Sequence, residues 1–172
     1  MSYLTVILDN YHRKSEFYCG KAMLDDYLHK QAGQDMKRSL CVVFVLEDGE
    51  HKIKGYYSLS NNSIPRDLVP EEIAKKLPKA YHTIPATLMG RLAVDKSFQG
   101  QGVGEILLLD ALKRCFDLSN ESLGSIAVIV DPLDDQAVSF YKKYGFIVLP
   151  DSGKMFLPMG TIKKLFEGIE KK

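Results

Sequence analysis

A run of glycine and glutamine residues, Gln99 to Gly104, separates an apolar stretch from a helical pattern in this sequence. Glycine lets backbone N–H groups approach a ligand closely, and a helix that follows directs its partially positive N-terminus at the same place. A phosphate group is the natural ligand of such a turn. The run therefore predicts an anion-binding loop between a strand and a helix, although a glycine-rich turn can also be purely structural.

Two common phosphate-binding motifs do not fit this run. A P-loop has Lys and then Ser or Thr after its last glycine, whereas Glu105 follows Gly104. The dinucleotide motif G-x-G-x-x-G requires a third glycine where this chain has Glu105 or Leu107. The pattern that remains is Gln99-x-x-Gly102-x-Gly104 after an apolar strand.

This pattern resembles the pyrophosphate loop of the GNAT family of N-acetyltransferases, Q/R-x-x-G-x-G/A. The family's second signature, A-x-x-F-Y-x-x-x-G-F, is reproduced in register by the segment from Ala137 to Phe146. The resemblance implies that acetyl-CoA is the donor substrate and that its pantetheine arm pairs with the backbones of Leu92, Ala93 and Val94. It also implies that the pyrophosphate binds at the residues of the glycine run, which are Gln99, Gly100, Gln101, Gly102, Val103 and Gly104.

Within the family, the chain is most similar to the acetyltransferase toxins of bacterial toxin–antitoxin systems. The segments that carry this likeness are Leu24–Leu28, Gly55–Leu59, Gly90–Asp95 and Phe156–Leu157. The likeness implies acetylation of the amino group of an aminoacyl-tRNA, a ribbon-helix-helix antitoxin as partner, and a possible homodimer. Candidate tRNA contacts are Arg91, Lys142 and Lys143.

The net charge of +1 departs from the basic surface expected of a tRNA-binding protein. A small-molecule amine or a protein amino group therefore stays an alternative acceptor. From a different class, the chain could be a noncatalytic acyl-CoA-binding module.

Tyr141 is the candidate catalytic acid because it lies inside the second signature. A phenol with an ordinary pKa of about 10 stays protonated at neutral pH, so it can protonate a departing thiolate whose thiol has a pKa of about 8.5. The alternative is an ordinary core aromatic, a role that suits Tyr144 better. No His or Glu stands out as a base, and an α-amino group, with a pKa near 8, needs less help than a lysine.

Length and composition favour one cytoplasmic domain spanning residues 1–172. The chain is 45% hydrophobic and 26% charged, and it has no apolar run of the about 20 residues that a membrane-spanning helix needs. Its scattered histidines and three separate cysteines predict no metal site and no disulfide framework.

Hydrophobic periodicity predicts an α/β protein with a mixed sheet. The resemblance implies the GNAT fold, which is a mixed, mostly antiparallel sheet with a splayed parallel strand pair and helices on both faces. In the helix after the glycine run, we expect Asp110, Lys113, Arg114 and Asp117 on the solvent face. The segment 61–85 reads as a surface excursion that contains a short helix. The expected strands are an N-terminal strand and 41–48, 52–60, 87–94, 125–130, 146–149 and 154–159, and the expected main helices are 21–32, 102–118 and 134–145.

Overall fold

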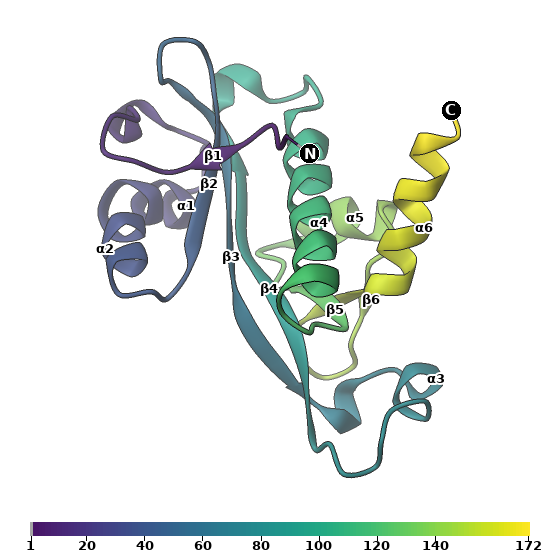
Figure 1. Cartoon of the computed structure of the whole chain (residues 1–172). Coiled ribbons are helices and arrows are strands. Elements are labelled where there is room, and N and C mark those ends of the chain that lie inside the picture. Colours follow the sequence, from purple (N-terminus) through teal and green to yellow (C-terminus); the bar gives the residue numbers. More distant parts are fainter. Residues whose placement is uncertain (1) are drawn as a thin grey trace. The chain divides into compact units, whose positions relative to one another are not determined.

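The computed structural model describes residues 2–172 (Figure 1). Its strands are β1 (Val6–Ile7), β2 (Val42–Glu47), β3 (Ile53–Pro65), β4 (Thr83–Val94), β5 (Ala127–Val130), β6 (Ile147–Val148) and β7 (Met155–Pro158). Its α-helices are α1 (Ala22–Asp26), α2 (Ala32–Lys37), α3 (Glu71–Ala74), α4 (Val103–Glu121), α5 (Asp135–Lys143) and α6 (Met159–Glu170). A π-helical segment, Tyr27–Gln31, joins α1 to α2, and the short 3-10 helices are Lys14–Glu16, Arg66–Leu68 and Lys96–Phe98.

The strands form one mixed sheet in the order β1-β2-β3-β4-β5-β7-β6. The β4–β5 pair is parallel, while β1–β2, β2–β3, β5–β7 and β6–β7 are antiparallel. The fold class expected from the sequence is therefore confirmed. Strands β2 and β3 form an antiparallel hairpin on either side of the turn that contains Asp48 and Gly49.

The parallel ladder between β4 and β5 is short. It contains only the pairs Thr87–Val128 and Leu88–Ile129. The rest of β4, from Met89 to Val94, lies beyond this ladder and has no partner on β5. The splayed strand pair that the sequence predicts thus begins after Leu88.

Two compact units make up the chain. The first contains Met1–Ser60 and Met89–Arg114, and the second contains Asn61–Leu88 and Cys115–Lys172, so β3, β4 and α4 contribute to both. The core of the first unit gathers around Leu28, Tyr56 and Val45. The core of the second gathers around Ile129 and Phe156. Each unit therefore buries an apolar cluster of its own.

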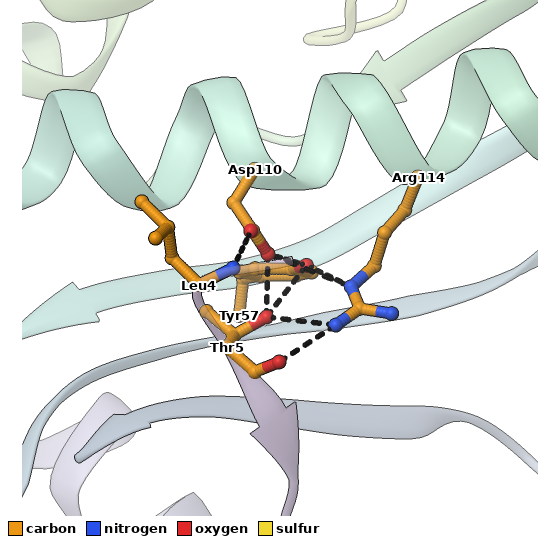
Figure 2. Close-up of polar contacts among 5 residues, drawn as sticks. All are labelled: Leu4, Thr5, Tyr57, Asp110 and Arg114. Atoms are coloured by element: carbon orange, nitrogen blue, oxygen red, sulfur yellow. Dashed lines mark hydrogen bonds and ion pairs between the residues drawn. The ribbon is translucent and has the colours of Figure 1, made fainter. Parts of the chain in front are cut away.

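The prediction that Asp110 lies on the solvent face of α4 is wrong. Asp110 is only 7% exposed, and its carboxylate accepts hydrogen bonds from the Leu4 N–H, the Thr5 hydroxyl and the Tyr57 hydroxyl (Figure 2). Arg114 lies one turn later and pairs with the Asp110 carboxylate at 3.5 Å. A helix wheel misses this because it assumes that a helix packs on one side only, whereas the segment that leads into β1 covers this second side of α4.

Several element boundaries differ from the sequence prediction, and one helix was missed. The first helical region continues through Gly33 to the end of α2, because a π-helical segment rather than a break separates its halves. Strand β3 extends to Pro65 and β4 begins at Thr83, so the excursion between them is shorter than expected. Helix α6 was not predicted at all; it starts directly after β7, with Pro158 at its N-cap and no capping side chain.

Candidate active site

The loop after β4 is fixed by the buried side chain of Asp95. This carboxylate accepts a hydrogen bond from the Ser97 N–H at 2.9 Å, as an N-terminal cap of the 3-10 helix Lys96–Phe98. It accepts a second bond from the Tyr18 N–H at 3.0 Å. Asp95 therefore joins the end of β4 to the segment before α1. Asp95 is a functional residue that the sequence motifs did not reveal, although an Asp directly before a short helix commonly caps it.

Gln99, the first residue of the loop motif, braces the loop from within. Its side-chain amide donates to the Val94 carbonyl at 2.9 Å and to the Cys19 carbonyl at 2.8 Å. The Gln101 amide donates to the Ser97 carbonyl at 3.1 Å. The side chains of both glutamines thus hold the shape of the loop, and the Gln99 side-chain amide uses both of its N–H groups to do so.

The backbone of the glycine run is arranged to receive an anion. Gly100 and Gly102 have φ angles of +76° and +80°, which side-chain-bearing residues rarely adopt, and a Cβ at either position would meet no atom within 4 Å. Among residues 2–172, the N–H groups from Gly100 to Glu105 find no hydrogen-bond acceptor. The first backbone bond of the helix runs from the Ile106 N–H to the Gly102 carbonyl. Several backbone N–H donors and the N-terminus of α4 are therefore available to the same anionic ligand.

The expected cofactor strand lies just before this loop. Leu92, Ala93 and Val94 are in the part of β4 that is not paired with β5, and only Ala93 is fully buried. Backbone groups in this part of β4 are available for an extended ligand. Arg91 precedes them, and its guanidinium lies 3.4 Å from the centre of the Tyr27 ring, a cation–π contact.

Tyr141 lies in the second unit, near the C-terminal end of α5. Asp134 caps the start of this helix by accepting a hydrogen bond from the Ala137 N–H at 2.8 Å. Gly145 ends it with a φ of +95°, and the chain then turns back so that the Phe146 N–H donates to the Tyr141 carbonyl at 3.2 Å. The glycine and phenylalanine of the signature thus place an aromatic ring 5.2 Å from the Tyr141 ring.

The Tyr141 hydroxyl has no hydrogen-bond partner among the described residues, although the side chain is 7% exposed. Burial raises the pKa of Tyr141 above its ordinary value, so the phenol keeps its proton at neutral pH. Tyr144 is half-buried, with its ring 5.2 Å from that of Phe140. These differences suit an acid at Tyr141 and a packing role at Tyr144.

The candidate tRNA contacts fall in both units. Lys142 and Lys143 are exposed on the last turn of α5, in the second unit, and the Lys143 ammonium lies 5.6 Å from the centre of the Tyr144 ring. Arg91 belongs to the first unit, with the cofactor strand and the glycine run. Each unit therefore contributes one part of the predicted set.

The residues of the first unit fit the donor substrate implied by the sequence. Acetyl-CoA carries a pyrophosphate, for which the unbonded N–H groups after Gln99 are suitable donors. It also carries an extended arm that matches the part of β4 that is not paired with β5. Within residues 2–172, no cluster of His, Cys, Asp or Glu has the arrangement of a metal site. None of the helices in this range is long and apolar enough to span a membrane.

Comparisons with known proteins agree with this geometry. Residues 39–148 match the family described as "Acetyltransferase (GNAT) domain". The chain is 30% identical over 165 residues to a "Probable toxin TacT" of Sinorhizobium fredii, covering 91% of this chain and 90% of the relative. It is 34% identical over 137 residues to a "tRNA-acetylating toxin" of Mycobacterium tuberculosis, covering 79% of each.

Two solved structures show the same similarity. One is AtaT complexed with acetyl-methionyl-tRNAfMet, with a TM-score of 0.86 at 30% identity, covering 96% of this chain and 99% of that one. The other is a tyrosine-to-phenylalanine mutant of KacT, with a TM-score of 0.86 at 28% identity, covering 96% of this chain and 100% of that one. Together with the loop and the Tyr141 signature, these matches show that this chain belongs to the GNAT family of acetyltransferases.

Proposed function

We propose that this acetyltransferase transfers the acetyl group of acetyl-CoA to the amino group of an aminoacyl-tRNA and thereby blocks translation. The observation that carries the proposal is the similarity, over 96% of the chain, to AtaT in complex with acetyl-methionyl-tRNAfMet. The relative from Mycobacterium tuberculosis is likewise described as a tRNA-acetylating toxin. We also propose that residues 1–172 act as a single GNAT domain.

Three groups of residues have roles in the proposed reaction. The donors from Gly100 to Glu105 bind the pyrophosphate, and the backbones of Leu92 to Val94 hold the pantetheine arm. When bound, acetyl-CoA supplies an activated thioester for attack by an amine. The proposal requires the Tyr141 hydroxyl to reach the sulfur and protonate it, a role that suits a phenol kept neutral by burial.

An aminoacyl-tRNA is the acceptor that needs least assistance. Its α-amino group loses a proton near pH 8, about two units below a lysine side chain, and the adjacent ester lowers the value further. Water can therefore take this proton, and no dedicated base has to be assigned. Arg91, Lys142 and Lys143 are the cations we assign to the phosphates of the acceptor stem.

Partners follow from the same relatives. AtaT is described in complex with the C-terminus of the antitoxin AtaR, and KacT as part of a KacTA–DNA complex, both at 27% identity to this chain. We infer that this chain binds a ribbon-helix-helix antitoxin, forms a homodimer and acts in the cytoplasm, where charged tRNA is found.

The decisive experiment incubates the purified protein with labelled acetyl-CoA and a mixed pool of aminoacyl-tRNA. Parallel reactions contain free amino acids, polyamines or a lysine-rich peptide. We expect label on the aminoacyl-tRNA and release of the labelled amino acid after mild alkaline hydrolysis of the ester. Label on the free amines alone would exclude the tRNA substrate and leave a small-molecule acetyltransferase.

A further inference from the structure

Two lysine side chains lie over one aromatic ring at the start of the anion-binding loop. The ammonium groups of Lys52 and Lys54 are 5.6 Å and 5.3 Å from the centre of the Phe98 ring. Phe98 ends the 3-10 helix and directly precedes Gln99. The Asp95 N–H donates to the Lys54 carbonyl at 2.9 Å, which fixes the β2–β3 hairpin beside this loop. All of these residues belong to the first unit.

Neither ammonium has an ion-pair partner among the described residues. One acidic side chain of the hairpin is Asp48, whose Oδ1 accepts hydrogen bonds from the Glu50 and Lys52 N–H groups at 2.8 Å and 3.0 Å. These bonds are the main reason why the pKa of Asp48 is lowered, and the charge of Lys54 adds to the effect. The Asp48 carboxylate is thus engaged by the turn backbone, and two like charges converge without a counter-ion in contact.

We propose that Lys52 and Lys54 bind the 3′-phosphate on the ribose of acetyl-CoA. This donor has two anionic parts: the pyrophosphate, which the backbone donors of the loop receive, and a phosphomonoester on the neighbouring ribose. A phosphomonoester carries close to two negative charges at neutral pH, so cationic side chains stabilise it more strongly than neutral N–H groups do. Ammonium groups bind phosphate as point charges, and contact with the Phe98 ring holds both of them beside the first residue of the glycine run.

The inference rests on acetyl-CoA as donor, and it gives this chain a means of selecting between related cofactors. Acetyl-dephospho-CoA has the same thioester, arm and pyrophosphate but lacks the 3′-phosphate. The loop and β4 bind both molecules in the same way. Lys52 and Lys54 distinguish between them.

Calorimetry with the whole protein tests this inference directly. We expect the wild type to bind acetyl-CoA roughly tenfold more tightly than acetyl-dephospho-CoA, a typical gain from two partly exposed charge contacts. The Lys52→Ala/Lys54→Ala variant should lose this preference by binding acetyl-CoA more weakly, with its affinity for acetyl-dephospho-CoA unchanged. The Lys52→Arg/Lys54→Arg variant should keep most of the preference. The Lys163→Ala/Lys164→Ala variant, which removes an exposed pair on α6, is the matched control and should behave as wild type.

Three results would overturn the inference. Equal weakening of both ligands would mean that the lysines act on the pyrophosphate or on the loop itself. Unchanged binding of both ligands, with a loss of aminoacyl-tRNA acetylation, would assign the lysines to nucleic acid. Failure of the wild type to bind either ligand would instead remove acetyl-CoA as the donor, and with it the proposed function.

Discussion

The Tyr57 hydroxyl donates a hydrogen bond to the Asp110 carboxylate at 2.7 Å, and both side chains are buried. Burial, with the adjacent carboxylate, raises the pKa of Tyr57, so the phenol stays protonated and can only donate to Asp110. Arg114 completes the cluster by donating to the Tyr57 hydroxyl at 2.9 Å and to the Thr5 carbonyl at 2.8 Å (Figure 2). This cluster joins the segment before β1 to α4, the helix that directly follows the glycine run.

Removal of the Asp110 carboxylate should destabilise the protein strongly. Asp110→Ala leaves buried donors and the Arg114 charge without their acceptor, and such losses typically cost about 3–5 kcal/mol of unfolding free energy. Urea denaturation followed by circular dichroism measures this change. Glu121→Gln, at an exposed position of the same helix, should alter stability by less than about 0.5 kcal/mol. A small effect at Asp110 would mean that water replaces its role.

Substitution at Gly102 should abolish acetyl-CoA binding without unfolding the protein. The φ of +80° is strained for any β-branched residue, and a valine side chain would occupy the open space beside the backbone donors. Calorimetry on Gly102→Val should detect no binding. Gly124→Val, where a Cβ also meets no atom within 4 Å but φ is not positive, serves as the control. Undiminished affinity in a folded Gly102→Val protein would contradict the loop assignment.

Loss of the Tyr141 hydroxyl should slow acetyl transfer while leaving the packing of the ring intact. Tyr141→Phe is expected to lower kcat by roughly 10²–10⁴-fold with little change in acetyl-CoA affinity, as for removal of a catalytic acid. Tyr144→Phe should change the rate far less. Steady-state kinetics on both variants distinguishes a catalytic role of Tyr141 from a packing role. Equal activities of the two variants would mean that Tyr141 is a core residue only.

Charge reversal on α5 should weaken tRNA binding selectively. Lys142→Glu/Lys143→Glu places two negative charges on an exposed turn, so the acetylation of charged tRNA should fall, and the salt dependence of tRNA affinity should become shallower. Acetyl-CoA binding and thioester hydrolysis should stay at wild-type levels. Unchanged tRNA affinity over a range of salt concentrations would exclude these lysines as phosphate contacts.

Stability should decrease at alkaline pH. Burial raises the pKa of Tyr56, Tyr57 and Tyr141, so each phenol is neutral in the folded protein at a pH where it ionises in the unfolded chain. Below about pH 10 both states keep the proton and the effect is absent; above it the unfolded state loses protons first, and unfolding is favoured by up to about 1.4 kcal/mol per pH unit for each tyrosine. Urea midpoints at pH 8, 9.5 and 11 check this expectation. Equal midpoints at pH 8 and pH 11 would be inconsistent with buried neutral phenols.

The structural features that short sequence motifs determine were predicted most accurately. The glycine run and the Ala137–Phe146 signature are local, and the strand–loop–helix and helix–turn structures form where the residue types require them. Helix α6 could have been predicted, because Ile162, Leu165, Phe166 and Ile169 follow helical spacing. Its start is difficult to recognise in the sequence because the short apolar strand β7 leads directly into it.

Features that depend on distant segments were not predictable. The burial of Asp110 requires the first residues of the chain to pack on α4, over a separation of 105 residues. The two lysines at Phe98 and the Asp95 cap on the Tyr18 segment likewise arise only when the hairpin and the loop are folded together. Periodicity within one helix or strand carries no information about such neighbours.

The internal bracing of the loop by Gln99 has a consequence for the speed of binding. Because its amide already joins the Val94 and Cys19 carbonyls, the loop reaches its binding shape during folding. Acetyl-CoA then meets a rigid receptor, so association should follow a single fast phase limited by diffusion and orientation. In Gln99→Ala, the loop would have to close around each arriving ligand, and stopped-flow traces should show a slower second step that no longer accelerates at high ligand concentration.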